Sequence, residues 1–415
     1  MNFRKKLLVL GGSPNQLRLV EAAKSAGIYT IVCNNTEQCS ARFACDQFYV
    51  QDYRDREKVL AIAEKEQIDG VISNSEAAMT NVAYVAEKMG LPGNTVDGIE
   101  QLVSKTRFRE LQRKCGLYAP KNIECSSWED VEKSITSLEF PIIVKPSECS
   151  GTRGTTRIDR KTDWDLLKKA FDECLHFSVN DKVSIEEFVE MPSLFVIDGD
   201  VFVCGDEYLW SGFFSNYRSS AVPMLPMIES FPIDINEEDF LIVKTAIKRL
   251  FAEAKIRHGQ YNVEMYFTRK RELFVIEINA RQGGNNIPHL IELHSGIDFD
   301  KLLVTTAVND LEYFNSIKDK PFSPRYITQY VVFSRKEGVL VGLDIKPEIA
   351  QYLIERTDVR QKGERVVRGT NAGESLSRLV FEFNDFDTQK YYVQQFENLI
   401  IPIVETDEQK SRDRE

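Results

Sequence analysis

Short apolar runs alternate with amphipathic stretches along the first hundred residues. The apolar runs have the length of buried strands, and the amphipathic stretches place apolar residues on one helical face. The predicted strands are Lys6–Leu10, Tyr29–Cys33, Phe48–Val50 and Gly70–Ser73, and the predicted helices are Asn15–Ala26, Val59–Lys65 and Ala77–Met89. This alternation of strand and helix predicts an open parallel sheet with helices on both faces.

The turn after the first predicted strand invites a dinucleotide-binding interpretation. It reads Gly11-Gly12-Ser13-Pro14-Asn15-Gln16, which lacks the Gly-x-Gly-x-x-Gly spacing. The second strand ends in Asn34-Asn35 and offers no acid for a ribose hydroxyl. NAD binding is therefore disfavoured, although the turn can still hold part of a substrate because ligands of open α/β sheets bind at the carboxyl ends of strands.

A linker signal at Leu91-Pro92-Gly93-Asn94 separates this unit from a second one of mixed pattern. The second unit is expected to contain helices at about 97–115, 163–175 and 240–255, strands at 141–145 and 183–188, a β-like stretch at 201–214 and a hairpin at 260–279. From about residue 325, strand-like runs at 330–333 and 379–383 flank a helix-like stretch at 347–355, which indicates a small α+β cap.

The predicted hairpin carries a pair of carboxylates. Both of its strands alternate with period two, so Glu277 and Asn279 share a face. If the turn is symmetric about Lys270-Arg271, Glu264 lies directly across from Glu277 with Cβ atoms about 5 Å apart. Facing like charges destabilise a sheet unless a cation lies between them, and Mg²⁺ prefers such oxygen ligands. Spacing alone leaves a magnesium site and a solvated polar face as equal alternatives.

The residues after the hairpin favour the magnesium site. Arg281 leaves the strand and leads into Gly283-Gly284, and Pro288 opens a helix. An arginine can bind phosphate or acyl-phosphate oxygens with two donors, and glycines let the backbone approach a ligand closely.

Two upstream segments suit a nucleotide. Lys145 ends an apolar strand and is followed by Ser150-Gly151-Thr152-Arg153-Gly154, an arrangement in which loop N–H groups and an ammonium meet an anion. The Gly-Lys-[Ser/Thr] spacing of a P-loop is absent. Glu186-Glu187-Phe188-Val189 closes another strand and is either an edge strand or a hinge that binds adenine. Lys105, at the start of a helix, is by itself a typical surface lysine.

Composition narrows the class of protein. A chain of 415 residues with 42% hydrophobic and 28% charged residues is expected to form about two to four soluble globular domains. A net charge of −11 argues against a nucleic-acid or anionic-membrane surface. No apolar stretch reaches the roughly 20 residues that span a bilayer, and no secretory pattern is present, so a cytoplasmic protein is expected. The 8 cysteines show no zinc-ligand spacing.

Taken in order, these motifs resemble the ATP-grasp superfamily, and within it the carboxylate–amine ligase branch that includes phosphoribosylglycinamide synthetase, biotin carboxylase and L-amino-acid ligase. Glu277-x-Asn279-x-Arg281-x-Gly283-Gly284 is the most specific of them. The resemblance implies an ATP-grasp fold at 96–310 with a lid at about 116–188, preceded by an α/β pre-ATP-grasp domain at 1–95 and followed by an α+β cap at 311–415. A homodimer is compatible with this resemblance.

The resemblance also implies roles for individual residues. Lys105 and Lys145 would contact ATP phosphates, and the Ser150–Gly154 loop, including Gly151 and Thr152, would close over them. The segment Glu186–Val189 would bind adenine, with the backbones of Glu187 and Val189 reading its edge beside Phe188. Glu264, Glu277 and Asn279 would hold Mg²⁺, with Mn²⁺ as a substitute, and Arg281 would face the transferred phosphate.

One departure and several alternatives remain. The family often has Gly-x-Glu after the hinge for the ribose hydroxyls, whereas this chain has Glu190-Met191-Pro192, so the ribose contact is unassigned. Arg218 and His289, with Arg281, Gly283 and Gly284, are candidate contacts for the small-molecule carboxylate and amine substrates. Amino-acid ligation, a purine-biosynthesis-type ligase and a nucleotide-binding regulator without turnover stay open.

Overall fold

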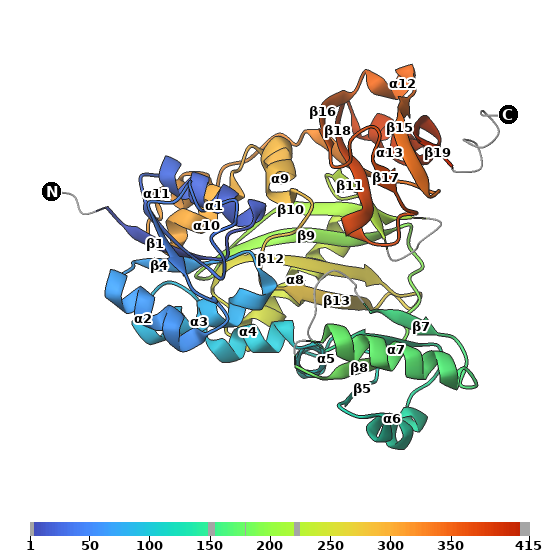
Figure 1. The fold of residues 1–415 in the computed structure, drawn as a ribbon, viewed down its shortest axis with the longest axis horizontal. Coiled ribbons are helices and arrows are strands. Elements are labelled where there is room, and N and C mark those ends of the chain that lie inside the picture. The colour runs from blue at the N-terminus through green and yellow to red at the C-terminus, as the bar shows by residue number, and fades with distance from the viewer. Residues whose placement is uncertain (1–3, 148–153, 179, 220–224, 407–415) are drawn as a thin grey trace.

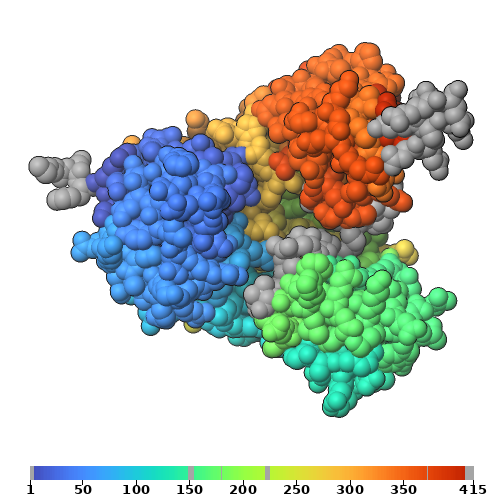
Figure 2. Space-filling model, in the orientation of Figure 1, coloured from blue at the N-terminus to red at the C-terminus, as the bar shows by residue number. Residues whose placement is uncertain are grey.

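The computed structural model describes residues 4–147, 154–178, 180–219 and 225–406. Three lobes surround a large central sheet, and the N-terminal lobe, the lid-like lobe and the C-terminal lobe appear blue, green and orange-red in Figure 1. The space-filling view in Figure 2 shows a hollow where the three lobes meet. Within the described ranges, no helix combines the length and apolar character needed to cross a membrane.

The N-terminal lobe is a parallel sheet with helices on both faces, which confirms the predicted fold class. Its strand order is β3-β2-β1-β4. Leu7 and Val9 point into one hydrophobic core and Leu8 and Leu10 into another, so α1 covers one face while α2 and α3 cover the other. The elements are β1 (Lys6–Leu10), α1 (Pro14–Ser25), β2 (Tyr29–Asn34), β3 (Gln47–Val50), α2 (Arg56–Glu66), β4 (Gly70–Ile72), η1 (Glu76–Ala78) and α3 (Met79–Met89).

Two short helices connect this lobe to the lid-like lobe, where a single helix at 97–115 was predicted. They are α4 (Val96–Val103) and α5 (Lys105–Lys114). Ser104 has an extended backbone (φ −81°, ψ 116°) and separates them. Arg107 then forms ion pairs back to Asp97 and Glu100 across the break. The prediction of one continuous helix was wrong because apolar periodicity does not reveal a change in helix direction.

The lid-like lobe is a four-stranded antiparallel sheet of order β5-β8-β6-β7. Helices α6 and α7 pack on it around Phe171, Ile142 and Ile185. Its elements are β5 (Asn122–Cys125), α6 (Trp128–Ser134), η2 (Ile135–Ser137), β6 (Ile142–Pro146), β7 (Thr156–Ile158), α7 (Trp164–Phe177) and β8 (Val183–Glu187).

The central sheet has eight antiparallel strands in the order β13-β12-β9-β10-β11-β14-β18-β16 and runs without a break into the C-terminal lobe. The central part contains β9 (Phe195–Cys204), β10 (Glu207–Arg218), β11 (Pro226–Phe231), α8 (Glu237–Glu253), β12 (His258–Phe267), β13 (Leu273–Asn279), α9 (Ile287–Ser295) and α10 (Phe299–Ala307). The C-terminal part contains α11 (Glu312–Ile317), β14 (Tyr326–Phe333), β15 (Gly338–Ile345), α12 (Pro347–Ala350), β16 (Leu353–Asp358), β17 (Arg365–Val366), η3 (Ala372–Glu374), β18 (Ser375–Phe383), α13 (Phe386–Val393), α14 (Phe396–Leu399) and β19 (Ile400–Glu405).

The predicted helix at 347–355 is helical only in its first half, and its last three residues begin a strand. Only Pro347–Ala350 is helical, and Leu353–Asp358 pairs with β18 as the edge of the large sheet. Pairing with a neighbouring strand here outweighs the helical spacing of the apolar residues.

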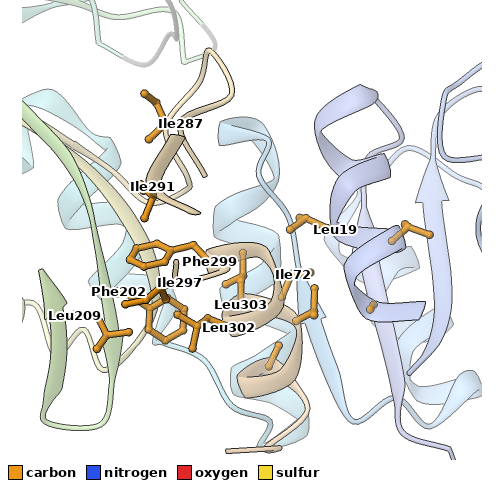
Figure 3. Close-up of a cluster of buried hydrophobic side chains, with 14 of the residues drawn as sticks. Leu19, Ile72, Phe202, Leu209, Ile287, Ile291, Ile297, Phe299, Leu302 and Leu303 are labelled. Carbon is orange, nitrogen blue, oxygen red and sulfur yellow. The ribbon is translucent and has the colours of Figure 1, made fainter. Parts of the chain in front are cut away.

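One buried helix fixes the N-terminal lobe on the central sheet. Figure 3 shows Phe299, Leu302 and Leu303 of α10 between the sheet residues Phe202 and Leu209 on one side and Leu19 and Ile72 of the N-terminal lobe on the other. The continuous apolar cluster joins the parallel sheet to the face of the central sheet that carries the polar residues described below.

Candidate active site

Six polar side chains form two rows across three neighbouring strands of the central sheet. Glu277, Glu264 and Asp198 are directly opposed on β13, β12 and β9, and Asn279, Asn262 and Asp200 form the next row. Residues directly opposite one another share a face, so four carboxyl groups and two amides gather on one side of the sheet. The alternate residues, such as Val263, Met265 and Ile278, point to the other side and pack in the core under α8.

The predicted pairing of Glu264 with Glu277 is confirmed, but the predicted turn is wrong. The connection spans 268–272, where the Thr268 N–H donates to the carbonyl of Glu272, and Arg271 adopts a left-handed conformation (φ 63°). Near the turn, Met265 pairs with Val275. Ile276 then forms a bulge, and beyond it Glu264 pairs with Glu277. An extra residue in one strand shifts the register by one, and that shift turns Glu277 onto the face of Glu264.

Glu264 lies in an acidic and buried setting. Arg218 on β10 forms an ion pair with it, with Nη2 2.7 Å from Oε2. Burial raises the pKa of Glu264 to about 7, aided by the neighbouring charges of Asp198 and Glu277 and opposed by Arg218. A metal cation that joined Arg218 beside these carboxylates would therefore be bound strongly.

Glu277 has a more cationic environment. Burial alone would raise its pKa, but the charges of Lys105, Lys145 and Arg281 and the hydrogen bond from Asn279 outweigh burial and lower the pKa. The three cations predicted to bind phosphate therefore lie close enough to act on the predicted metal ligand. Asn279 donates from Nδ2 to Glu277 and to Asn262, both at 3.2 Å, so its carbonyl oxygen is the atom that can bind a cation.

Lys145 emerges from β6 into a buried ion-pair cluster. Its Nζ lies 2.7 Å from Oε2 of Glu186, and that oxygen also accepts a hydrogen bond of 3.2 Å from Arg109. Glu186 is 1% exposed. Although burial opposes ionisation, the charges of Arg109 and Lys145 hold the pKa of Glu186 at about 2. Burial, together with Arg109, lowers the pKa of Lys145 despite its contact with Glu186.

The loop predicted to close over phosphates lies mostly outside the described residues, because Ser150, Gly151 and Thr152 fall in the gap at 148–153. Gly154 is described and has a left-handed conformation (φ +70°). A Cβ there would lie 3.1 Å from the ring of Phe177, so close packing against α7 adds to the preference for glycine.

In the predicted adenine segment, Glu186 points into the ion-pair cluster, and Glu187 is the last residue of β8. The Phe188 N–H donates to the carbonyl of Pro141, and the Tyr266 hydroxyl donates to the carbonyl of Val189 at 2.6 Å. Adenine binding by this segment stays a prediction.

Glu190, the candidate ribose contact after the hinge, forms an ion pair with Arg157 at 3.1 Å. The guanidinium of Arg157 also lies over the ring of Phe188, 4.2 Å from its centroid. The ribose contact stays unassigned.

The segment after Arg281 is held by buried hydrogen bonds. The Gly283 N–H donates to both carboxylate oxygens of Asp200, at 3.0 and 2.9 Å. A Cβ at Gly283 would lie 2.9 Å from Oδ1 of Asp200, whereas a Cβ at Gly284 would meet open space. Gly283 is therefore required by its close packing against Asp200, and only Gly284 leaves room for a ligand.

The neighbours of Gly283 and Gly284 are fixed as well. Gln282 donates to Asp300 and Gln260, and Asn285 donates to Glu229, whose other oxygen accepts from Gln329 of the C-terminal lobe. This segment is thus ordered by groups from the central sheet, α10 and the C-terminal lobe.

The predicted substrate residues occupy different places. Arg218 lies at Glu264, and Arg281 donates to the carbonyl of Gln282 and lies 3.4 Å from Glu76 of the N-terminal lobe. His289 is 3.0 Å from both carboxylate oxygens of Glu355 on β16, away from the carboxylate rows in the sheet order. No substrate role is tested by these contacts, so each stays a prediction.

Three residues of the candidate site were not predicted from the sequence. Asp198 and Asp200 lie two apart in an apolar strand, the same signal that revealed Glu277 and Asn279, but the predicted β-like stretch began at 201. Arg109 lies on α5 and is 1% exposed. Its burial has no sequence signal, because an arginine on an amphipathic helix is normally solvated.

The donor set fits Mg²⁺ when phosphate oxygens complete it. In the described part of the chain, no group of three or more His, Cys, Asp and Glu side chains is arranged to hold a metal alone. Glu264, Glu277 and the Asn279 carbonyl provide hard oxygen ligands, and magnesium commonly combines one or two carboxylates with substrate phosphates.

Comparisons with known proteins agree with this architecture. Residues 138–289 match the model of the ATP-grasp domain, and residues 20–93 match that of the ATP-grasp N-terminal domain. The carbamoyl phosphate synthase large chain of Vibrio vulnificus is 24% identical over 354 residues, which cover 81% of this chain and 31% of the relative. The chain therefore spans about a third of the length of this curated relative.

Solved structures resemble the chain over nearly its whole length. The L-amino acid ligase from Bacillus licheniformis has a TM-score of 0.78 at 17% identity and covers 98% of this chain and 100% of its own. Phosphoribosylglycinamide synthetase from Anaerococcus prevotii has a TM-score of 0.70 at 20% identity, with 97% and 100% covered. These likenesses establish the shared fold.

The fold is that of an ATP-grasp protein: an open α/β domain, a small antiparallel lid-like sheet and a large antiparallel sheet that carries the carboxylate rows. Residues 20–93 and 138–289 of the chain are thus matched to the ATP-grasp N-terminal domain and the ATP-grasp domain.

Proposed function

We propose that this protein is an ATP- and Mg²⁺-dependent, ADP-forming ligase that activates a carboxylate as an acyl phosphate for capture by an amine. The observation that carries the proposal is the meeting of Glu264 and Glu277 with cations from three elements. Lys105 begins α5, Lys145 is the penultimate residue of β6 in the lid-like sheet, and Arg281 follows β13. All three lower the pKa of Glu277.

The charge of each side chain in the site determines its proposed role. Lys105 and Lys145 bind phosphate oxygens of ATP, and Arg281 faces the phosphate that is transferred. Glu264, Glu277 and the Asn279 carbonyl hold Mg²⁺, which when bound offsets negative charge on the phosphates. The substrate carboxylate attacks the γ-phosphate, ADP leaves, and the amine then displaces phosphate from the acyl phosphate. Positioning and electrostatic stabilisation supply most of the catalysis.

The lid assignment belongs to the same proposal. The lobe formed by β5–β8 carries Lys145 and Glu186, so it can cover ATP and exclude water from the acyl phosphate. The domain limits 1–95, 96–310 and 311–415 remain part of the proposal.

The test is ADP formation by the purified protein with Mg-ATP and paired panels of acids and amines. The proposal predicts little ADP without an acid and a strong rise with one acid–amine pair. Amino-acid pairs and the substrates of phosphoribosylglycinamide synthetase are the first two panels, since the fold resembles both kinds of enzyme. ATP binding without stimulation by any pair would favour a nucleotide-binding regulator, and full turnover without an acid would contradict the acyl-phosphate scheme.

A further inference from the structure

A buried arginine contacts both halves of the proposed site. Arg109 lies on α5, which Figure 1 shows beside the lid-like lobe and near the β13 edge of the large sheet. Its guanidinium donates to Glu186 at 3.2 Å and to the carbonyl of Ile276 at 2.9 Å. The same group also donates to the carbonyl of Val275 at 3.1 Å.

The two carbonyls belong to the β13 bulge. Ile276 is the extra residue, and Val275 precedes it. A bulge interrupts the ladder, so its carbonyls need other donors when they are buried. Arg109 provides two of these hydrogen bonds, and Gln112, one helical turn later on α5, donates a third to Val275 at 2.9 Å.

The bulge determines where Glu277 points. Without it, the register set near the turn would continue and would place Ile276 across from Glu264. Glu277 would then turn to the face occupied by Val263 and Ile278, inside the apolar core. The facing carboxylates therefore depend on an irregularity that Arg109 and Gln112 stabilise.

The other side of Arg109 reaches the phosphate-binding lysine through Glu186. Oε2 of Glu186 lies between Arg109 and Nζ of Lys145. The guanidinium also lies over the ring of Phe274, 5.0 Å from its centroid, which further restricts its position.

We infer that Arg109 is a positioning residue that fixes the metal-binding carboxylate Glu277 and the phosphate-binding Lys145 relative to each other. This inference rests on the proposed function, because both roles come from it. Both terminal nitrogens of Arg109 donate to protein groups, which are Gln112, Val275, Ile276 and Glu186. Its planar guanidinium donates to two carbonyls and a carboxylate at once, which a lysine ammonium on a flexible stem does not reproduce.

The test compares Arg109→Lys with Arg107→Lys as a matched control, since Arg107 lies on the same helix but pairs with Asp97 and Glu100 at the surface. Mn²⁺ binding is measured by electron paramagnetic resonance in the presence of ADP, and folding by circular dichroism. Arg109→Lys is expected to stay folded and to bind Mn²⁺ about 10- to 100-fold more weakly, as for other residues that orient metal ligands. Arg107→Lys is expected to bind Mn²⁺ like the wild type.

Gln112→Leu is the second variant, because it removes one hydrogen bond to the bulge and the oxygen that accepts from Arg109 Nη1 at 2.7 Å, but neither partner of the Arg109–Glu186 and Lys145–Glu186 ion pairs. A folded Gln112→Leu protein is expected to show a smaller loss of Mn²⁺ affinity, about 10-fold or less. If folded Arg109→Lys bound Mn²⁺ as tightly as the wild type, the positioning role of Arg109 would be refuted while the proposed function would stand. If Arg109→Lys does not fold, wild-type Mn²⁺ affinity in Gln112→Leu would refute that role. A wild-type protein that binds no Mn²⁺ with ADP would overturn the proposed metal site as well.

Discussion

Glu264 and Glu277 face each other because Ile276 is an extra residue in β13. Arg218 on β10 forms an ion pair with Glu264, which lies two strands away, and Lys105, Lys145 and Arg281 act on Glu277. A sheet position that would normally be destabilised by like charges is thus prepared for a cation.

Glu277→Gln tests this pair directly. The substitution keeps the size of the side chain but removes the charge that is proposed to hold the metal and that balances the nearby cations. We expect ADP formation to fall by at least about 100-fold, with the circular dichroism spectrum unchanged. Glu272→Gln, on the exposed turn of the same hairpin, is the control and should leave ADP formation unaltered. Wild-type turnover in Glu277→Gln would refute the metal assignment.

Glu186→Ala should unfold the protein more readily. It leaves Arg109 and Lys145 buried without their shared carboxylate, and breaking a buried ion pair in this way costs about 3–5 kcal/mol in the free energy of unfolding. Glu187→Ala removes a partly exposed neighbour and should cost about 1 kcal/mol or less. Urea denaturation measures both, and equal stabilities for the two variants would contradict the role of the cluster.

Asp200→Asn should loosen the segment after Arg281. Asp200 is fully buried and its carboxylate accepts hydrogen bonds from Gly283, Gln260 and Asn262. An asparagine NH₂ group in this place would face N–H donors and could not accept their hydrogen bonds. We expect a loss of about 1–3 kcal/mol in the free energy of unfolding. The control is Asp206→Asn, on the exposed turn between β9 and β10, which should be neutral. A neutral Asp200→Asn would show that the loop does not depend on this carboxylate.

His294 should make the protein less stable in acid. Burial lowers its pKa from 6.5 to about 4, although its Nδ1–H donates to the carbonyl of Arg325 at 2.7 Å. The unfolded state therefore binds a proton at a higher pH than the folded state, and the stabilising contribution, complete above pH 6.5, is lost as the pH falls towards 4. The shift corresponds to about 3 kcal/mol at most.

The comparison for His294 is His294→Phe, which keeps an aromatic ring against Phe231 and Phe322. Its free energy of unfolding should vary less than that of the wild type between pH 6.5 and about 4.5. Identical slopes for the two proteins would show that His294 does not titrate as described.

The sequence predicted most of the architecture because its apolar periodicities are strong. The continuous apolar run in Lys6–Leu10 predicts a buried strand, and the structure places its residues in two cores. Leu353–Asp358 was assigned in part to a helix because its pairing with β18 depends on a strand far away in the chain. Ser104 did carry a local sign, since serine is favoured at helix N-termini and Lys105 was placed at a helix start, but the single helix predicted at 97–115 did not use it.

The site was predicted where side chains repeat along one strand and was missed where contacts join distant segments. Glu277 and Asn279 stand two apart, so their shared face follows from the sequence. The Glu264–Glu277 pairing was correct even though the turn was not, since the bulge at Ile276 compensates for the odd loop. The burial of Arg109 between Glu186 and the bulge comes only from tertiary packing.

The central claim is that ATP activates a carboxylate here, and ADP formation with hydroxylamine as the capturing amine tests it most directly. With Mg-ATP and an acid that the enzyme activates, we expect the hydroxamate of that acid and ADP to form in equal amounts. We expect Glu277→Gln to form neither. ADP formation that is independent of every acid, with no hydroxamate, would contradict the account.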